Sequence, residues 1–168
     1  MSFGREIPIE TYGIPKNSEW GPLLWQMLHA VAEKLGHAPS HTIFLDQRRE
    51  MIFVLRDIEN VMPCPMCRNH YREWRSKRPI DQLPETQSEF REAVRRWLFD
   101  LHEDVNRSRG FESGLVLEQL RPMYAGYDIK ELGRQFAFLL NRALRLRAIE
   151  RDSMVRFNTH YAFLSRLL

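Results

Sequence analysis

The hydrophobic positions along the chain recur at the spacing of an α-helix almost throughout. Apolar residues three or four positions apart form stripes, and runs of alternating apolar and polar residues rich in Val, Ile and Thr are missing from the sequence. This pattern predicts an all-α protein. The expected helices lie near residues 18–35, 43–61, 64–77, 86–109 and 113–124.

Capping residues place the starts of several of these helices. Ser18 is suited to cap the first helix, and Thr86 with Glu89 forms a capping box for the fourth. Asp128 with Glu131 forms another box, which opens a long Arg-rich helical stretch. The sequence thus predicts a bundle of four or five helices followed by a C-terminal helical extension.

We divide the chain into two parts on this basis. Residues 1–125 are expected to form the functional domain, and residues 126–168 the helical extension. The extension is expected to add core or a dimer surface, with a docking surface for a partner as the alternative.

Composition narrows the class of protein. Hydrophobic residues make up 43% of the 168 residues, which is typical of a globular chain and not of a disordered one. No apolar run approaches the roughly 18 residues of a membrane span. The opening residues, MSFGREIPIETYG, lack the charged-then-apolar pattern of a signal peptide, so we expect a soluble protein without a secretory signal.

The two cysteines of the chain stand three positions apart in the segment VMPCPMCRNHYREW. A bridge between such near neighbours closes too small a loop to stabilise a fold much, so a structural staple is the weakest explanation. Cys64 follows Pro63 and fits the first position of a helix, which would make Cys67 its neighbour one turn on. The helix dipole and the nearby Arg68 and Arg72 would favour a thiolate there. The motif therefore indicates a redox-active pair.

Zinc binding is a competing interpretation of the same motif. Cys64, Cys67 and His70 supply three plausible ligands, whereas a structural zinc site takes four. Either His29 or His102 would have to complete the site through the fold. A thioredoxin-type site is poorly supported, because no strand precedes the motif. We expect no metal.

A redox pair needs an acceptor for its electrons, and two other segments offer a place for one. EWGPLLWQMLHAVAEKL puts Trp25 and His29 one turn apart on the same helix face, after Trp20 and Gly21. In LFDLHEDVNRSRG, the imidazole of His102 and the aliphatic Val105 are followed by an amide and two guanidinium groups, those of Asn106, Arg107 and Arg109. Aromatic planes, imidazoles, an amide and arginines together suit a stacked heteroaromatic ring that carries phosphates.

Three motifs in this order resemble the Erv/ALR family of FAD-linked sulfhydryl oxidases. They are W-G-x-x-x-W-x-x-x-H, C-x-x-C-x-x-H-aromatic and H-x-x-V-N, and the resemblance covers residues 18–125. It implies a small helical bundle that holds FAD next to the Cys64 and Cys67 redox pair. The FAD contacts that it implies are Trp20, Gly21, Trp25, His29, Tyr71, His102, Val105, Asn106, Arg107, Arg109 and Tyr124.

The resemblance also implies a reaction. A partner thiolate would attack the disulfide at Cys64, and Cys67 would pass two electrons to FAD, from which dioxygen would take them to give hydrogen peroxide. Because the chain has no second dithiol, the substrate is expected to reach the pair directly, as a protein dithiol of the thioredoxin-like or CxxC kind. The low cysteine content resembles virus-encoded members, which work in the host cytoplasm and on virion proteins. Family members are commonly homodimers.

The second hypothesis is an Arg-rich helical binding module. Of the 25 basic residues 21 are Arg, yet the net charge is only +3, which makes nucleic-acid binding the weaker reading. This hypothesis treats the CxxC pair as incidental or zinc-binding and leaves the Trp/His and His/Asn motifs without a role. Its arginines are Arg134, Arg142, Arg145, Arg147 and Arg151.

Overall fold

A computed structural model describes residues 13–168 of the chain as a helical protein, and no strand occurs among these residues. The all-α prediction is confirmed. The elements are α1 (Asn17–Lys34), α2 (His41–Val61), α3 (Pro65–Ser76), the short 3₁₀ helix η2 (Ile80–Gln82), α4 (Gln87–Ser108), η3 (Leu117–Gln119), α5 (Leu120–Tyr124), α6 (Ile129–Arg145) and α7 (Arg151–Leu167).

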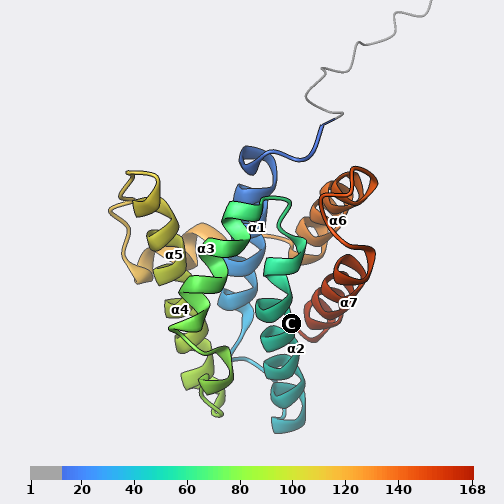
Figure 1. Cartoon of the computed structure of the whole chain (residues 1–168). Coiled ribbons are helices and arrows are strands. Elements are labelled where there is room, and N and C mark those ends of the chain that lie inside the picture. The colour runs from blue at the N-terminus through green and yellow to red at the C-terminus, as the bar shows by residue number, and fades with distance from the viewer. Residues whose placement is uncertain (1–12) are drawn as a thin grey trace, which may run out of the picture.

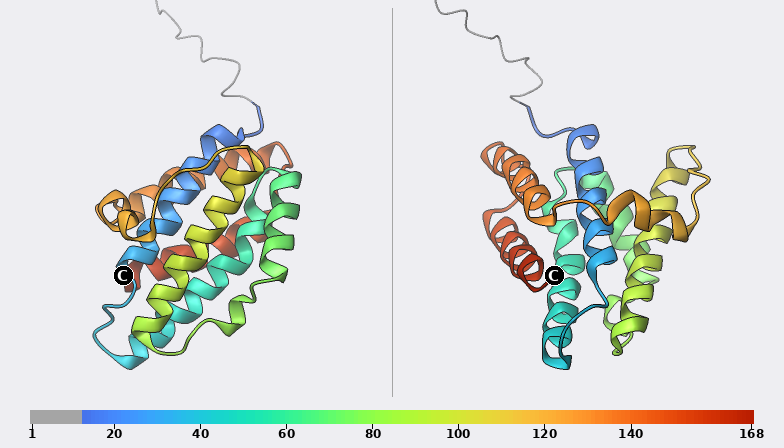
Figure 2. Two further views of the ribbon diagram at one scale, coloured as in Figure 1. Left: turned by 90° about the vertical axis from the view of Figure 1, so that its left-hand side faces the viewer. Right: turned by 180° about the vertical axis from the view of Figure 1, so that it is seen from behind.

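Helices α1 and α2 form the centre of the molecule (Figures 1 and 2). Helices α6 and α7 pack against them on one side, and α4 and α5 pack against α1 on the other. One hydrophobic core runs through these layers, because Phe136 and Phe157 of the last two helices belong to the same buried cluster as Leu28 and Leu55. The C-terminal helices are thus packed into the bundle, and the division at residue 125 stays a prediction.

Of the predicted helix caps at Asp128 and Ser18, the structure contains the first and not the second. Asp128 accepts hydrogen bonds from the backbone of Lys130 and Glu131, as expected for the start of α6. The Ser18 prediction is wrong, since α1 already begins at Asn17. The Glu19 carboxylate accepts a hydrogen bond from the Lys16 backbone at 2.7 Å and so holds the first turn in place of a serine cap.

The segments after α4 are less regular than predicted. The helix expected over 113–124 is reduced to η3 and α5, because Gly114 adopts a left-handed conformation with φ of 67°. The long C-terminal stretch is divided by a turn over residues 146–150. Arg147 has φ of 57° there, and the Ala148 backbone donates to the Ala143 carbonyl, which is a standard way to end a helix.

A buried ion pair joins α1 to α4. The Arg95 guanidinium donates to the Glu33 carboxylate at 2.7 Å, and the two side chains are only 9% and 1% exposed. Arg95 also contacts Glu92 at 2.9 Å, but the Glu92 side chain is 53% exposed. The Glu33 pair therefore helps to set how α1 lies on α4, which positions the site described below.

None of the helices within residues 13–168 combines the length and hydrophobicity needed to cross a membrane. The expectation of no signal peptide concerns the start of the chain, and residues 1–12 lie outside the described part.

We predict that Glu33→Ala lowers the free energy of unfolding by about 3 kcal/mol or more, because it leaves the buried Arg95 charge without its buried partner and with only the exposed Glu92 carboxylate. Glu92→Ala is the matched control, since it removes an exposed carboxylate from the same guanidinium and is expected to cost less than about 1 kcal/mol. Urea denaturation of both variants measures the difference. Equal losses in the two variants would show that the buried pair does not have this role.

Candidate active site

The two cysteines lie at the start of α3. Cys64 is the residue before the helix, not its first residue as predicted, and its sulfur accepts a hydrogen bond from the Cys67 backbone at 3.2 Å. Pro65 occupies the first helical position, where a missing N–H costs nothing. The Cα atoms of Cys64 and Cys67 are 5.2 Å apart, within the usual range for a disulfide, and the sulfurs are bonded to each other.

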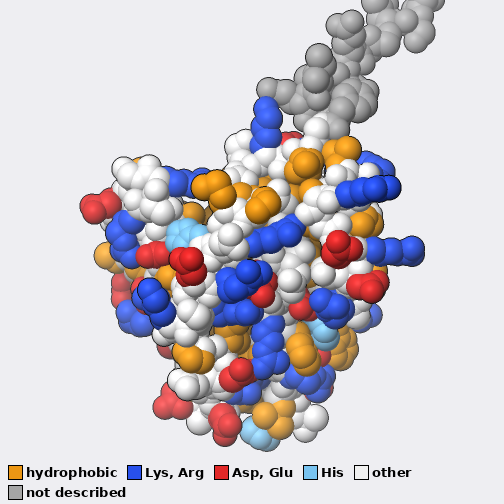
Figure 3. Space-filling view, viewed as in Figure 1, with side chains coloured by type: hydrophobic (Ala, Val, Ile, Leu, Met, Phe, Trp, Pro, Cys, Tyr) orange, Lys and Arg blue, Asp and Glu red, His pale blue; other side chains and the backbone are white. Residues whose placement is uncertain are grey.

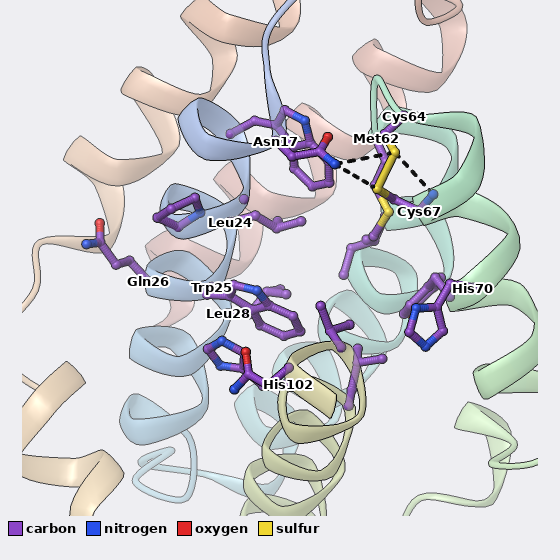
Figure 4. A pocket seen from close by; sticks show the side chains of 18 of the residues that line it. Asn17, Leu24, Trp25, Gln26, Leu28, Met62, Cys64, Cys67, His70 and His102 are labelled. Atoms are coloured by element: carbon purple, nitrogen blue, oxygen red, sulfur yellow. Dashed lines mark hydrogen bonds between the residues drawn. A yellow bond between two sulfur atoms is a disulfide. The ribbon is translucent and has the colours of Figure 1, made fainter. Parts of the chain in front are cut away.

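A cavity of about 750 Å³ opens beside this disulfide, between α1, α3, α4 and α5 (Figure 4). Its volume is in the range of about 300–1,000 Å³ that is typical of small-molecule sites. It brings together all the predicted site residues except His29 and Arg107. Those that line it are Cys64, Cys67, Trp20, Gly21, Trp25, Tyr71, His102, Val105, Asn106, Arg109 and Tyr124.

Stacked rings form one wall of the cavity. Trp25 of α1 lies parallel to His102 of α4, with ring centres 4.0 Å apart and planes at 7°. His29 is fully buried behind this pair, where its Nε2 is 3.1 Å from His102 Nδ1 and its ring stacks on Tyr124 at 4.7 Å. His29 therefore supports the wall instead of lining the cavity.

Burial keeps both imidazoles neutral. It lowers the pKa of His29 to about 3, with a smaller effect from the neighbouring His102. Burial also lowers the pKa of His102 to about 4, where Glu103 acts in the opposite direction. With both rings uncharged, one nitrogen of the pair donates and the other accepts in the hydrogen bond between them.

Tyr71 contributes a surface, not a reactive hydroxyl. Its side chain is buried, and its hydroxyl donates a hydrogen bond to the Leu55 backbone carbonyl. Burial raises the pKa of Tyr71 far above its usual value, so the hydroxyl stays protonated. Tyr71 thus closes the cavity floor next to the cysteines.

Polar groups from the C-terminal end of α4 line the cavity. The Asn106 amide donates to Glu103 at 3.2 Å, and Arg109 lines the cavity at the end of the helix. Arg107 does not line it, because its exposed side chain turns to Asp104 at 3.5 Å. Asp104 also binds His70 Nε2 at 2.7 Å and so connects α4 to α3.

Several cavity residues were not identified from the sequence. Asn17 points at the sulfur pair and donates to both sulfurs (Figure 4). Gln26 donates to the Tyr127 hydroxyl at 3.4 Å, and Met62 and Met66 flank the cysteines. A single polar residue in the first turn of a helix carries no periodic signal, so Asn17 could be found only in three dimensions.

The zinc hypothesis can be compared with this geometry. Both sulfurs are engaged in the disulfide, and His70 is bonded to Asp104. Within residues 13–168 no group of three or more His, Cys, Asp or Glu side chains is arranged to hold a metal ion.

Two arginines of the second hypothesis are held in ion pairs with acidic side chains. Arg134 pairs with Glu131 at 2.7 Å, and the nearly buried Arg142 pairs with Glu19 at 2.7 Å. Figure 3 shows basic and acidic side chains interspersed on the face that it displays.

The histidine pair predicts a pH dependence of stability. Unfolded histidines titrate near 6.5, whereas the folded pKa values of His29 and His102 are about 3 and 4. As the pH falls below 6.5, only the unfolded chain gains these protons, so stability that is present at neutral pH is lost toward the folded values. We expect the free energy of unfolding to fall by up to about 1.4 kcal/mol per pH unit for each histidine.

Urea denaturation between about pH 7 and pH 5 measures this slope, above the range in which unfolded carboxylates titrate. His102→Gln is expected to flatten the slope, and the exposed His41→Gln serves as the control. A slope that is unchanged in His102→Gln would contradict the prediction.

Several known proteins are similar to this chain in sequence over about half of its length. An African swine fever virus protein (isolate Pig/Kenya/KEN-50/1950) named FAD-linked sulfhydryl oxidase is 28% identical over 88 residues, which cover 52% of this chain and 66% of the relative. The Oryza sativa FAD-linked sulfhydryl oxidase ERV1 is 30% identical over 55% of this chain and 42% of the relative. The mitochondrial FAD-linked sulfhydryl oxidase erv1 of Schizosaccharomyces pombe is 30% identical over 58% of this chain and 49% of the relative.

The chain therefore spans less than two thirds of the length of these relatives. No solved structure gives a significant match. These relatives do not favour the Arg-rich binding module.

The model of the Erv1 / Alr family matches residues 22–120, a segment that includes Trp25, both cysteines and His102. Because this match covers more than half of the 168 residues, the chain belongs to the Erv1/Alr family.

Proposed function

We propose that the chain is an FAD-linked sulfhydryl oxidase that forms disulfide bonds in partner proteins. The observation that carries the proposal is the position of the Cys64–Cys67 disulfide in the wall of the same cavity as the parallel Trp25 and His102 rings. The names of the relatives support the same activity.

The cavity residues fit FAD by size and chemistry. The neutral faces of Trp25 and His102 suit a flat heteroaromatic ring, and Asn106 and Arg109 supply an amide and a positive charge for the polar and phosphate parts. Gly21 lines the cavity, and a Cβ atom there would meet nothing within 4 Å. The missing side chain therefore leaves room for a ligand.

The thiol chemistry begins at the disulfide. A partner thiolate attacks Cys64 and forms a mixed disulfide. The neighbouring Met66 side chain is 82% exposed, so this end of α3 is accessible from solvent. The bond between Cys64 and Cys67 breaks, and its electron pair stays on the Cys67 sulfur. A second partner thiolate then displaces Cys64, so the partner gains a disulfide and the pair is reduced by two electrons.

Trp25, His102, Asn106 and Arg109 would hold FAD, which would supply an acceptor for the two electrons of the dithiol and reactivity toward dioxygen, with hydrogen peroxide as the expected product. The protein's own residues set the position of the sulfurs, keep the adjoining rings uncharged and exclude water from the buried side of the cavity. In the proposal the substrate dithiol reacts directly with Cys64 and Cys67, which are the two cysteines of this sequence. A small thioredoxin-like or CxxC protein has the chemistry for this.

The proposal includes two wider features. One is a homodimer. Because α6 covers one face of α1 and α7 covers one face of α2, the dimer would use other surfaces. The other is a virus-encoded enzyme, which the similarity to the African swine fever virus proteins supports. The proposal further places its action in the host cytoplasm and on virion proteins.

We predict that the protein, purified from a flavin-replete host, carries FAD and consumes dioxygen with an excess of dithiothreitol, releasing hydrogen peroxide. Cys64→Ser and Cys67→Ser should each reduce oxygen consumption to the rate without protein, because neither variant can cycle between disulfide and dithiol. Absorbance spectra of the variants should still show bound flavin. Folded protein without flavin, or either variant with full turnover, would contradict the proposal.

We also predict that Gly21→Leu reduces FAD content at least about tenfold, since its side chain would enter the ligand space, while helix stability rises by about 1 kcal/mol. Gly126→Leu is the matched control, because Gly126 also faces open space but does not line the cavity. Flavin absorbance per protein and thermal denaturation measure the two effects. If Gly21→Leu kept full FAD content, FAD would have to bind elsewhere.

A further inference from the structure

Asn17 makes a direct contact with the redox pair. Its side-chain amide donates to the Cys67 sulfur at 3.4 Å and to the Cys64 sulfur at 3.7 Å (Figure 4). Cys64 also accepts from the Cys67 backbone, whereas the Cys67 sulfur has Asn17 as its hydrogen-bond donor among the described residues. Asn17 lies outside the family match, which begins at residue 22.

The first turn of α1 holds Asn17 in this position. The Glu19 carboxylate binds the Lys16 backbone at 2.7 Å on one side of Asn17. Arg142 of α6, only 7% exposed, donates to both Glu19 oxygens at 2.7 Å. A buried residue of the C-terminal helices thus fixes the turn that carries Asn17.

Two other polar side chains near the cysteines are bonded elsewhere. Arg68 donates to the Met62 and Ala148 carbonyls, and His70 is held by Asp104 at 2.7 Å. Within residues 13–168, the Asn17 amide is the side-chain donor that forms hydrogen bonds to the sulfurs.

The amide interacts differently with the two redox states. A neutral disulfide sulfur is a weak acceptor, whereas a thiolate forms a charge-assisted hydrogen bond that is considerably stronger. When a partner thiolate bonds to Cys64, the Cys64–Cys67 bond breaks and its electron pair makes Cys67 a thiolate. Asn17 Nδ2 is closer to this leaving sulfur than to Cys64.

We propose that Asn17 is a positioning residue that raises the reduction potential of the Cys64–Cys67 disulfide by donating a hydrogen bond to the thiolate formed on reduction. This deepens the proposed function, in which the pair oxidises partner dithiols. A higher potential makes the pair a stronger oxidant of its substrate, as it stabilises the reduced form.

The test is anaerobic equilibration of the full chain with glutathione buffers, after which alkylation and mass spectrometry give the reduced fraction of the pair. Asn17→Ala removes the donor, and Asn17→Asp replaces it by a carboxylate of the same shape. The carboxylate also suits the first turn of a helix, so the second variant is expected to fold. We expect the equilibrium constant for reduction to fall about tenfold in Asn17→Ala, or about 30 mV, and further in Asn17→Asp.

Asn69→Ala is the matched control, because Asn69 is an exposed asparagine of α3 whose amide oxygen accepts a hydrogen bond from Arg72 and whose amide makes no hydrogen bond to a sulfur among the described residues. Its equilibrium constant should equal that of the unmodified chain. The proposal is overturned if folded Asn17→Ala and Asn17→Asp keep the original constant, or if Asn69→Ala shifts as much as they do. The measurement does not depend on oxygen consumption, so it can fail or succeed independently of the oxidase activity.

Discussion

The parallel contact between Trp25 and His102 is the interaction on which the rest of the site depends. It requires α1 and α4 to lie close and in a fixed register, which the buried pair of Glu33 and Arg95 supports from the far end of α1. The contact also removes the imidazoles from water, and this keeps them uncharged at neutral pH. A flat, neutral wall is thereby produced next to the start of α3, where the sulfurs lie. The chemistry that we propose needs this wall and the sulfur pair in one cavity.

The C-terminal helices contribute to the site as well as to the core. Arg142 of α6 binds the first turn of α1 through Glu19, and Arg68 of α3 reaches the Ala148 carbonyl in the turn between α6 and α7. These contacts connect the last two helices to both segments that meet at the disulfide. The C-terminal helices thus have a structural role close to the site.

Much of the fold could be predicted because most helices bury one apolar stripe. Phe90, Val94 and Leu98 follow the helical period and are all buried, so α4 was identified almost to the residue. The turn at Arg147 was not foreseen, because this position has a left-handed conformation without the glycine that usually marks it. The start of α1 was misplaced because a carboxylate at Glu19, and not the serine hydroxyl, completes its first turn.

The site was predicted to the extent that its residues carry recognisable chemistry in ordered motifs. Trp25, His102 and the cysteines stand out by type and spacing, and the fold brings them together. His29 lies behind the wall, and Arg107 turns toward Asp104. Both positions depend on side-chain packing, which cannot be inferred from the pattern of a single sequence. Asn17 is the clearest case, since its role follows only from its distance to the sulfurs.

A crystal structure of the FAD-loaded chain tests the central claim most directly. We expect the flavin ring between the Trp25 and His102 wall and the start of α3, in van der Waals contact with the Cys67 sulfur. Flavin bound at a different surface, or a cavity filled by side chains while FAD is present, would contradict it.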